Sequence, residues 1–336
     1  MNKIKITDTS LRDGNHSVKH QFSVEDVKNV VKALDEAGID IVEVGHGDGL
    51  TGSTINYGFS KESDIDLVNA AASVAKKAKI AVLLLPGIGT VPDMKKAYEA
   101  GARVVRVATH VTEADISMEH ITEAKKIGFF TVGFLMMAHR APVERVVEEA
   151  MKMESYGADV VYTTDSAGAM VPNDVRAKIS ALVENLSIPV GFHSHNNLGL
   201  AIGNSLAALE SGATYIDGSL GGLGAGAGNT ATEMIVGVME RSGYEINADF
   251  FKSMDAATQV LQPIVEKYGV KLPKIQDPLM LGYAGVYSSF MLHAKRAEKR
   301  FGVDYREIIL EAGKREAVGG QEDWLYEIAA ELAKNK

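Results

Sequence analysis

Two segments of the chain place possible metal ligands directly after apolar, strand-like runs. Near the amino terminus such a run leads into Arg12 and Asp13, and His16 follows three residues later. Far along the chain, a second apolar run leads into His193 and His195. Successive side chains of a strand alternate in direction, so these two imidazoles point the same way. One carboxylate and two imidazoles can supply three ligands of a divalent metal and leave positions open for substrate.

The residues beside these ligands have chemistry of their own. The fixed cation of Arg12, next to a metal, suits an enolate or carboxylate oxygen; a structural ion pair is the alternative. His16 can act as a general base because imidazole exchanges protons near neutral pH; the alternative is a solvated loop histidine. Glu43 ends another apolar run. We expect it either to orient a histidine or Arg12, or to be an acid buried with a cation.

Two more segments end in polar or glycine-rich sequence. Asp165 and Ser166 follow an apolar run. The Ser166 hydroxyl can hold a substrate carboxylate, while turn formation and helix capping are the competing roles for both residues. Residues 221–229 are rich in glycine. Their amides can cradle an anion ahead of a helix, although the segment lacks the lysine of a phosphate-binding loop.

The composition narrows the class of protein. The chain has 336 residues, of which 46% are hydrophobic and 24% charged, so it can bury a large core. Its formal net charge is -9 and its basic residues are not clustered, which argues against binding to nucleic acid or anionic membranes. The absence of cysteine excludes disulfides and thiolate ligands. Without a signal-type leader or a membrane-spanning apolar run, a cytoplasmic location is expected.

The elements that must position these residues form a repeating pattern. Glycines that end helical segments are followed at once by apolar strands, at 38, 101, 128, 157 and 212. Their spacing and the opening strand predict eight strands, near 3–9, 39–45, 79–85, 103–107, 129–136, 159–164, 188–193 and 214–218. Most are apolar on both faces, as in a parallel sheet covered by helices. We therefore predict a (β/α)8 TIM barrel over residues 1–262, with its last helix near 229–242.

The remaining residues exceed what such a barrel needs. Residues 250–336 have a helical pattern interrupted by proline and glycine turns, and we assign 263–336 to a second, all-helical domain. This domain is expected to pack against the barrel or a partner, with a solvated helical tail as the alternative.

Several of these motifs together resemble a known family. The segments 9–14, 193–195 and 221–229 look like the metal-dependent lyase and Claisen-condensing superfamily of barrels. Within it, 14–16, 43–50 and 282–290 resemble the 4-hydroxy-2-oxovalerate aldolases, and the likeness covers essentially the whole chain. It is most specific at His16, where acyl-CoA-condensing relatives usually carry glutamine.

The resemblance implies a role for each site residue. Asp13, His193 and His195 would bind a divalent ion, commonly manganese. His16 would be the base and Arg12 would steady a pyruvate enolate. Further positions match family residues near the substrate, namely Tyr283 on a helix and Leu83 and Leu85 at the aldehyde end of the pocket. Barrel filling is the alternative for the leucines, and packing of a 283, 287 and 290 helical face is the alternative for Tyr283.

The resemblance also implies an activity and a partner. The expected reaction is retro-aldol cleavage of 4-hydroxy-2-oxovalerate to pyruvate and acetaldehyde. The expected partner is an acylating acetaldehyde dehydrogenase, docked by the helical carboxyl-terminal domain. The alternatives are an acyl-CoA-dependent Claisen-condensing synthase of the same superfamily, and a catalytically silent partner subunit of the dehydrogenase.

Overall fold

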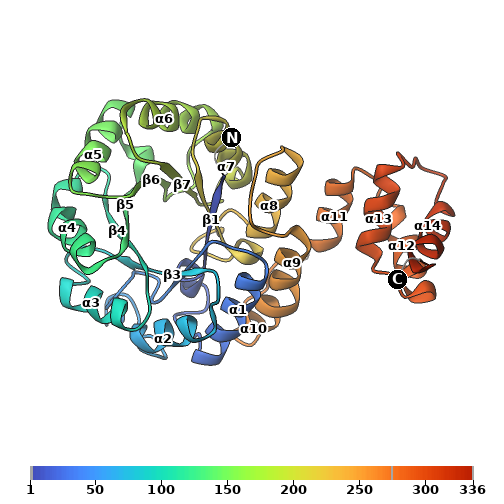
Figure 1. Cartoon of the computed structure of the whole chain (residues 1–336), viewed down its shortest axis with the longest axis horizontal. Helices are drawn as coiled ribbons and strands as arrows, with labels where there is room; N and C mark the ends of the chain where they lie inside the picture. The colour runs from blue at the N-terminus through green and yellow to red at the C-terminus, as the bar shows by residue number, and fades with distance from the viewer. Residues whose placement is uncertain (1–2, 274, 335–336) are drawn as a thin grey trace. The chain divides into compact units, whose positions relative to one another are not determined.

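The computed structural model describes residues 3–273 and 275–334. Eight parallel strands close into a barrel in chain order, and β8 pairs with β1 (Figure 1). The strands are β1 (Lys5–Leu11), β2 (Ile41–Val44), β3 (Lys79–Leu84), β4 (Val104–His110), β5 (Phe130–Met136), β6 (Val160–Asp165), β7 (Val190–Ser194) and β8 (Tyr215–Gly218). The predicted (β/α)8 barrel is confirmed, and all eight strands fall at the expected places.

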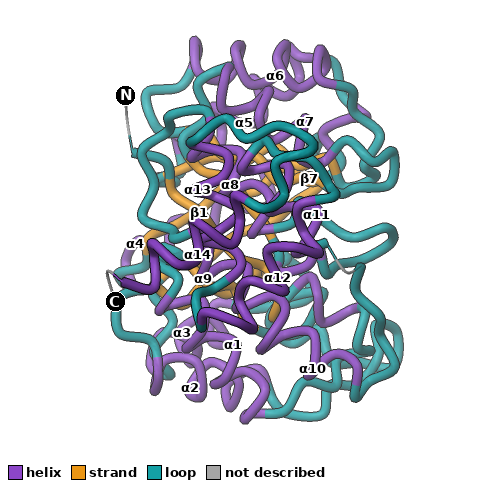
Figure 2. Tube along the Cα trace, turned by 90° about the vertical axis from the view of Figure 1, so that its right-hand side faces the viewer, coloured by secondary structure: helices purple, strands orange, loops and turns teal. Residues whose placement is uncertain are grey.

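A ring of helices surrounds the strands (Figures 1 and 2). These helices are α1 (Val24–Glu36), α2 (Asp64–Val74), α3 (Val91–Glu99), α4 (Met118–Ile127), α5 (Val143–Ser155), α6 (Pro172–Asn185), α7 (Ala201–Glu210) and α8 (Thr232–Arg241). Short helical turns lie between some strands and the helices that follow them, namely η1 (Asp13–His16), η2 (Ala114–Ser117), η3 (Ala138–Arg140) and η4 (Leu220–Gly222). Because the helices cover the sheet, its strands are buried on both faces, which explains their apolar sequences.

The glycines that predicted the helix ends have the backbone conformation that this role requires. Their φ angles are positive, at 82° for Gly38, 113° for Gly101, 107° for Gly128, 105° for Gly157 and 101° for Gly212. Residues with a Cβ rarely adopt this left-handed region, so glycine is needed where each helix turns into the next strand.

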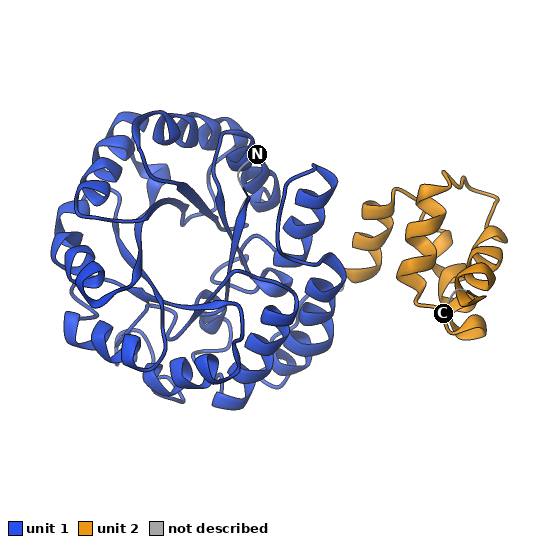
Figure 3. Ribbon diagram, viewed as in Figure 1, with its two compact units in different colours: residues 1–272 blue, residues 273–336 orange. Residues whose placement is uncertain are grey.

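The chain divides into two compact units, Met1–Leu272 and Pro273–Lys336 (Figure 3). The first unit ends with α9 (Phe250–Asp255), the π-helical turn η5 (Ala256–Leu261) and α10 (Gln262–Glu266). Both α9 and η5 pack against α1. In α10, Ile264 and Val265 are buried, so this helix belongs to the barrel's outer layer.

The second unit contains only helices among its described residues. They are α11 (Gln276–Ala284), α12 (Phe290–Phe301), α13 (Tyr305–Lys314) and α14 (Trp324–Lys334). Phe290, Ile308 and Leu325 are fully buried and give this unit a core of its own. The predicted helical carboxyl-terminal region is thus confirmed. Among the described helices of both units, none has the length and apolar sequence to cross a membrane.

Candidate metal and catalytic site

Three possible metal ligands meet at the carboxyl ends of two strands. Asp13 begins the turn η1 directly after β1, His193 lies at the end of β7, and His195 follows β7. Their ligand atoms all lie within 4.8 Å of one another. The Nε2 atoms of His193 and His195 are 3.4 Å apart. The two histidines therefore present their nitrogens to one point, as the alternation of side chains along a strand predicts.

The protonation states of these groups suit a cation. Nδ1 of His193 donates a hydrogen bond to Oδ2 of Asp217 over 2.8 Å, which leaves the Nε2 lone pair free. Burial and the neighbouring His193 lower the pKa of His195 to about 4, so this imidazole is neutral at pH 7. Burial alone would raise the pKa of Asp13, but Arg12 and the two histidines outweigh it and keep that pKa well below its usual value. The site thus offers the neutral imidazole of His195, the Nε2 atom of His193 and one ionised carboxylate.

A buried network of ion pairs lies beside the three ligands. Arg12 pairs through Nη1 with Asp13 and through Nε with Glu43, each at 2.7 Å. Arg106 reaches Glu43 at 3.1 Å and also pairs with Asp217. All five side chains are at least nine-tenths buried. Three carboxylates face two guanidinium groups, so the network has one negative charge in excess, and a bound cation would offset it.

The glycine-rich loop contributes to the same site. The side-chain amide of Asn229 donates to Oδ2 of Asp13 over 2.7 Å, and the backbone amide of Ala225 donates to the same oxygen over 3.3 Å. The anion that this loop contacts is therefore the Asp13 carboxylate of the protein itself. These two donors fix the orientation of the expected metal ligand.

His16 lies in a cluster of imidazoles beside the turn that follows β2. Its ring meets the ring of His20 edge-on, with centroids 5.1 Å apart, and His20 stacks on His46 at 3.7 Å. A Cβ added to Gly47 would lie 2.4 Å from Cε1 of His16, so the His16 ring lies directly on the Gly47 backbone. Nδ1 of His20 accepts from the Gly47 amide over 3.3 Å. Burial, His46 and His16 lower the pKa of His20 to about 4, so this ring is a neutral support.

Comparison with known proteins identifies the family. Residues 3–260 match the HMGL-like family and residues 273–334 match the DmpG-like communication domain. The 4-hydroxy-2-oxovalerate aldolase of Geobacillus thermodenitrificans is 56% identical over 333 residues, covering 99% of this chain and 96% of that protein. The enzyme of the same name from Pelotomaculum thermopropionicum is 56% identical, over 99% and 97%. The chain belongs to the 4-hydroxy-2-oxovalerate aldolase family.

Solved structures agree with this family's fold. A Bacillus subtilis HMG-CoA lyase superposes with a TM-score of 0.68 at 22% identity, covering 82% of this chain and 96% of that one. The amino-terminal domain of a putative aldolase from Bacteroides vulgatus gives 0.68 at 24% identity, over 79% and 88%. At these identities the likeness concerns the barrel alone.

The other residues expected at the site make packing contacts or hydrogen bonds within the barrel. Leu83 belongs to the apolar cluster inside the barrel, and Leu85 packs against that cluster. The Ser166 hydroxyl accepts from the Met137 amide over 2.9 Å. The two oxygens of Asp165 accept from the amides of Ala169 and Met170, each at 2.9 Å, so this carboxylate stabilises the turn that precedes α6.

Tyr283 lies on α11 in the second unit and is half-buried. The single helical face expected for positions 283, 287 and 290 is wrong. Gly285, with a φ of 72°, ends α11, and Phe290 begins α12. Phe290 is buried, whereas Tyr287 lies between the helices and is 62% exposed. The three residues therefore form no common packing surface on one helix.

Sequence reasoning missed two members of the ion network, Arg106 and Asp217. Both interrupt otherwise apolar strands, β4 and β8. A charged residue within a strand that helices cover needs an oppositely charged partner inside the barrel. A charge in such a strand could therefore have indicated a buried ion pair. Asn229 carried no comparable signal, because an amide after a glycine-rich loop is common in turns.

Proposed function

We propose that the protein cleaves 4-hydroxy-2-oxovalerate into pyruvate and acetaldehyde with the help of a divalent metal. The observation that carries the proposal is the convergence of Asp13, His193 and His195 beside the buried guanidinium of Arg12. The names of the family's members support the substrate. We expect the metal to be Mn²⁺, which carboxylate and imidazole ligands accept.

The proposed mechanism assigns one task to each residue. When bound by Asp13, His193 and His195, the metal supplies Lewis acidity to the 2-oxo group of the substrate. His16 takes the proton of the C4 hydroxyl, and the C3–C4 bond breaks to release acetaldehyde. The guanidinium of Arg12 faces the developing enolate charge of pyruvate, and protonation at C3 completes the reaction.

Further residues complete the proposed substrate site. Ser166 holds the substrate carboxylate, Leu83 and Leu85 shape the aldehyde end, and Tyr283 borders the reacting groups. The second unit, which matches a communication domain, docks an acylating acetaldehyde dehydrogenase that receives the aldehyde. A cytoplasmic location is part of the same proposal.

Pyruvate release from racemic 4-hydroxy-2-oxo acids, with and without Mn²⁺, tests the proposal. Alanine at position 13, 193 or 195 should abolish metal-dependent cleavage while circular dichroism shows a folded barrel. Full activity of metal-free His193→Ala would reject the metal assignment. Condensation of an acyl-CoA without aldol cleavage would favour the synthase, and metal binding without any turnover would favour the silent partner subunit.

His16→Ala separates the base from the metal site. We expect this variant to bind metal and pyruvate but to cleave slowly and to lose the near-neutral limb of its pH–rate profile. A wild-type rate with an unchanged profile would assign the base elsewhere.

A further inference from the structure

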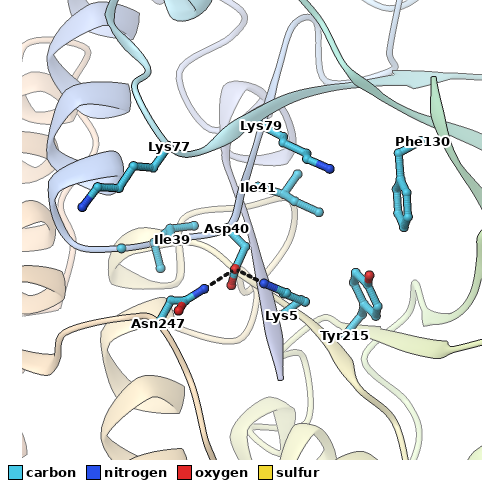
Figure 4. Close-up of a pocket in the computed structure, with 10 residues that line it drawn as sticks. Lys5, Ile39, Asp40, Ile41, Lys77, Lys79, Phe130, Tyr215 and Asn247 are labelled. Carbon is cyan, nitrogen blue, oxygen red and sulfur yellow. Dashed lines mark hydrogen bonds and ion pairs between the residues drawn. The ribbon is translucent and has the colours of Figure 1, made fainter. Parts of the chain in front are cut away.

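A second cavity lies at the end of the barrel opposite the candidate metal site. Its volume is about 400 Å³, within the range of small-molecule sites (Figure 4). Its lining comes from the amino ends of strands, including Lys5 of β1, Ile41 of β2 and Lys79 of β3. Asp13 and His193 lie at the carboxyl ends, so the two sites are separate.

One side of this cavity is electrically neutral. Asp40 pairs with Lys5 over 2.7 Å and accepts from the side-chain amide of Asn247 over 2.7 Å. Its other oxygen accepts from the Ile6 amide over 3.1 Å. The only carboxylate in the lining is thereby fully engaged, and it cannot neutralise a further cation.

The other side presents an ammonium group above an aromatic ring. Nζ of Lys79 lies 5.5 Å from the centre of the Phe130 ring. No carboxylate of the described residues forms an ion pair with Lys79 or Lys77. Figure 4 shows the Lys79 amine pointing toward Phe130, whereas the Lys77 amine points away from the ring. Lys79 is therefore the cation available to a ligand in this cavity.

Two aromatic rings meet across the barrel floor. Phe130 of β5 and Tyr215 of β8 lie nearly parallel, with centroids 6.2 Å apart and an angle of 22° between the planes. Both side chains are only half-buried, so part of their apolar surface faces the cavity. Within the described chain, the Tyr215 hydroxyl makes no hydrogen bond. Covering this surface would be favourable by about 25 cal/mol per Å².

We propose that this cavity binds a small aromatic monocarboxylate. The ring of the ligand covers Phe130 and Tyr215, and its carboxylate pairs with the Lys79 ammonium group. One free cation beside the rings favours a monoanion over a phosphate, because the Lys5 charge is already balanced and the Lys77 amine points away from the Phe130 ring. The paired aromatic faces favour a planar body over an aliphatic one.

Calorimetric titration of the metal-loaded, full-length protein with benzoate tests the proposal. We expect saturable binding with one benzoate per chain. Lys79→Met should weaken the affinity tenfold or more, which corresponds to about 1.4 kcal/mol. Lys77→Met is the matched control, since it removes the same charge at the same end of the barrel from an amine that points elsewhere. It should change the affinity by less than about twofold, as expected of a screened surface charge.

Two further titrations locate the ligand. Cyclohexanecarboxylate has the same charge without the planar ring and should bind more weakly than benzoate. Excess pyruvate should not displace benzoate, because pyruvate is expected at the metal site. Absence of saturable binding, equal losses in the two lysine variants, or displacement by pyruvate would each overturn the proposal. Both lysine variants should retain wild-type cleavage, which confirms that their barrels are intact.

Discussion

At the scale of single residues, the least expected side chain is the buried Arg106. It joins Glu43 to Asp217, which in turn holds the imidazole of His193. Its guanidinium also lies 4.3 Å from the Phe134 ring centre, a cation–π contact that helps to hold the group in place. Arg106 thereby links Glu43, which holds Arg12, to Asp217, which orients the proposed metal ligand His193. We interpret it as a positioning residue, since its ion pairs are with Glu43 and Asp217, which in turn hold Arg12 and His193.

We predict that Arg106→Lys folds but binds metal roughly 10–100-fold more weakly, the usual effect of losing support behind a ligand. A lysine keeps the positive charge, but its single ammonium group cannot pair with both Glu43 and Asp217 as the planar guanidinium does. Metal titration measures the effect. Arg103→Lys, an exposed arginine just before the same strand, is the control and should bind metal normally. Equal metal affinity of the wild-type protein and Arg106→Lys would show that Arg106 only fills the barrel.

A second residue-scale prediction concerns Gly47, against which the His16 ring lies. An alanine Cβ here would lie 2.4 to 2.6 Å from three atoms of that ring, so the imidazole must move. Misplacing a reacting group by about 1 Å can cost about 10²-fold in rate. We therefore expect Gly47→Ala to lower kcat by that order while metal affinity stays unchanged.

The control for Gly47→Ala is Gly203→Ala on α7, where an added Cβ would have no neighbour within 4 Å. It should retain full activity. Normal turnover of Gly47→Ala would show that the His16 ring is not the base or that its position is not decisive.

At the scale of elements, the barrel was predictable because the same local sequence pattern, a helix-ending glycine followed by an apolar strand, recurs along the chain. Each of Gly38, Gly101 and Gly128 combines a helix end with the start of a strand, so the chain's own periodicity marks the eightfold unit. The convergence of Asp13, His193 and His195 was predictable for a related reason, since strand ends in a parallel barrel converge. The ion network was not, because Arg106 and Asp217 are 111 residues apart in sequence and only the closed barrel brings them together.

Strand β3 carries the prediction for substrate length. Leu83 is buried in the barrel cluster and Leu85 packs against it, two residues apart and on the same face. Replacing either leucine by alanine removes volume on that face. We expect the preference to shift toward longer 4-hydroxy-2-oxo acids, measured as the ratio of kcat/KM for the substrates that release two-carbon and three-carbon aldehydes. Unchanged ratios would show that both leucines only fill the barrel.

At the scale of the whole molecule, stability should depend on a carboxyl that the mechanism does not use. Burial raises the pKa of Glu233 from 4.5 to about 7, and the nearby Asp8 adds to this shift. The folded protein then holds a proton that the unfolded chain releases, so the contribution of Glu233 to the free energy of unfolding is largest below pH 4.5 and is lost as the pH rises through about 7. The loss is on the order of 3 kcal/mol.

Glu233→Gln removes this dependence because the amide oxygen can still accept from the Gly221 amide but cannot ionise. Urea unfolding should show equal stability of the variant and wild type below pH 4.5, and a more stable variant above pH 7. Glu184→Gln, an exposed glutamate on α6, changes the charge equally and should leave the difference between the two pH values as it is. A variant that is no more stable than wild type at alkaline pH would contradict the assignment.

The boundary between the two units, after Leu272, determines where the chain must be truncated to test whether the second unit docks the partner. A truncation before residue 263 would remove Ile264 and Val265, which are buried in the first unit, and would damage the barrel itself. Ending the chain at Leu272 avoids this damage. We expect that truncated protein to keep the barrel's circular dichroism and its metal affinity, and to lose co-purification with the acylating acetaldehyde dehydrogenase. Retained co-purification would place the docking surface on the first unit.

Tyr283→Phe, made in the full-length chain, separates docking from catalysis. The substitution keeps the packing of the half-buried ring and deletes only the hydroxyl. If that hydroxyl borders the substrate, partner binding survives while the cleavage rate, or the discrimination between the stereoisomers of the substrate, falls. Kinetics on the two separated stereoisomers measure both effects. Since α11 packs against α13 within the second unit, unchanged kinetics on both isomers would make Tyr283 part of that packing alone.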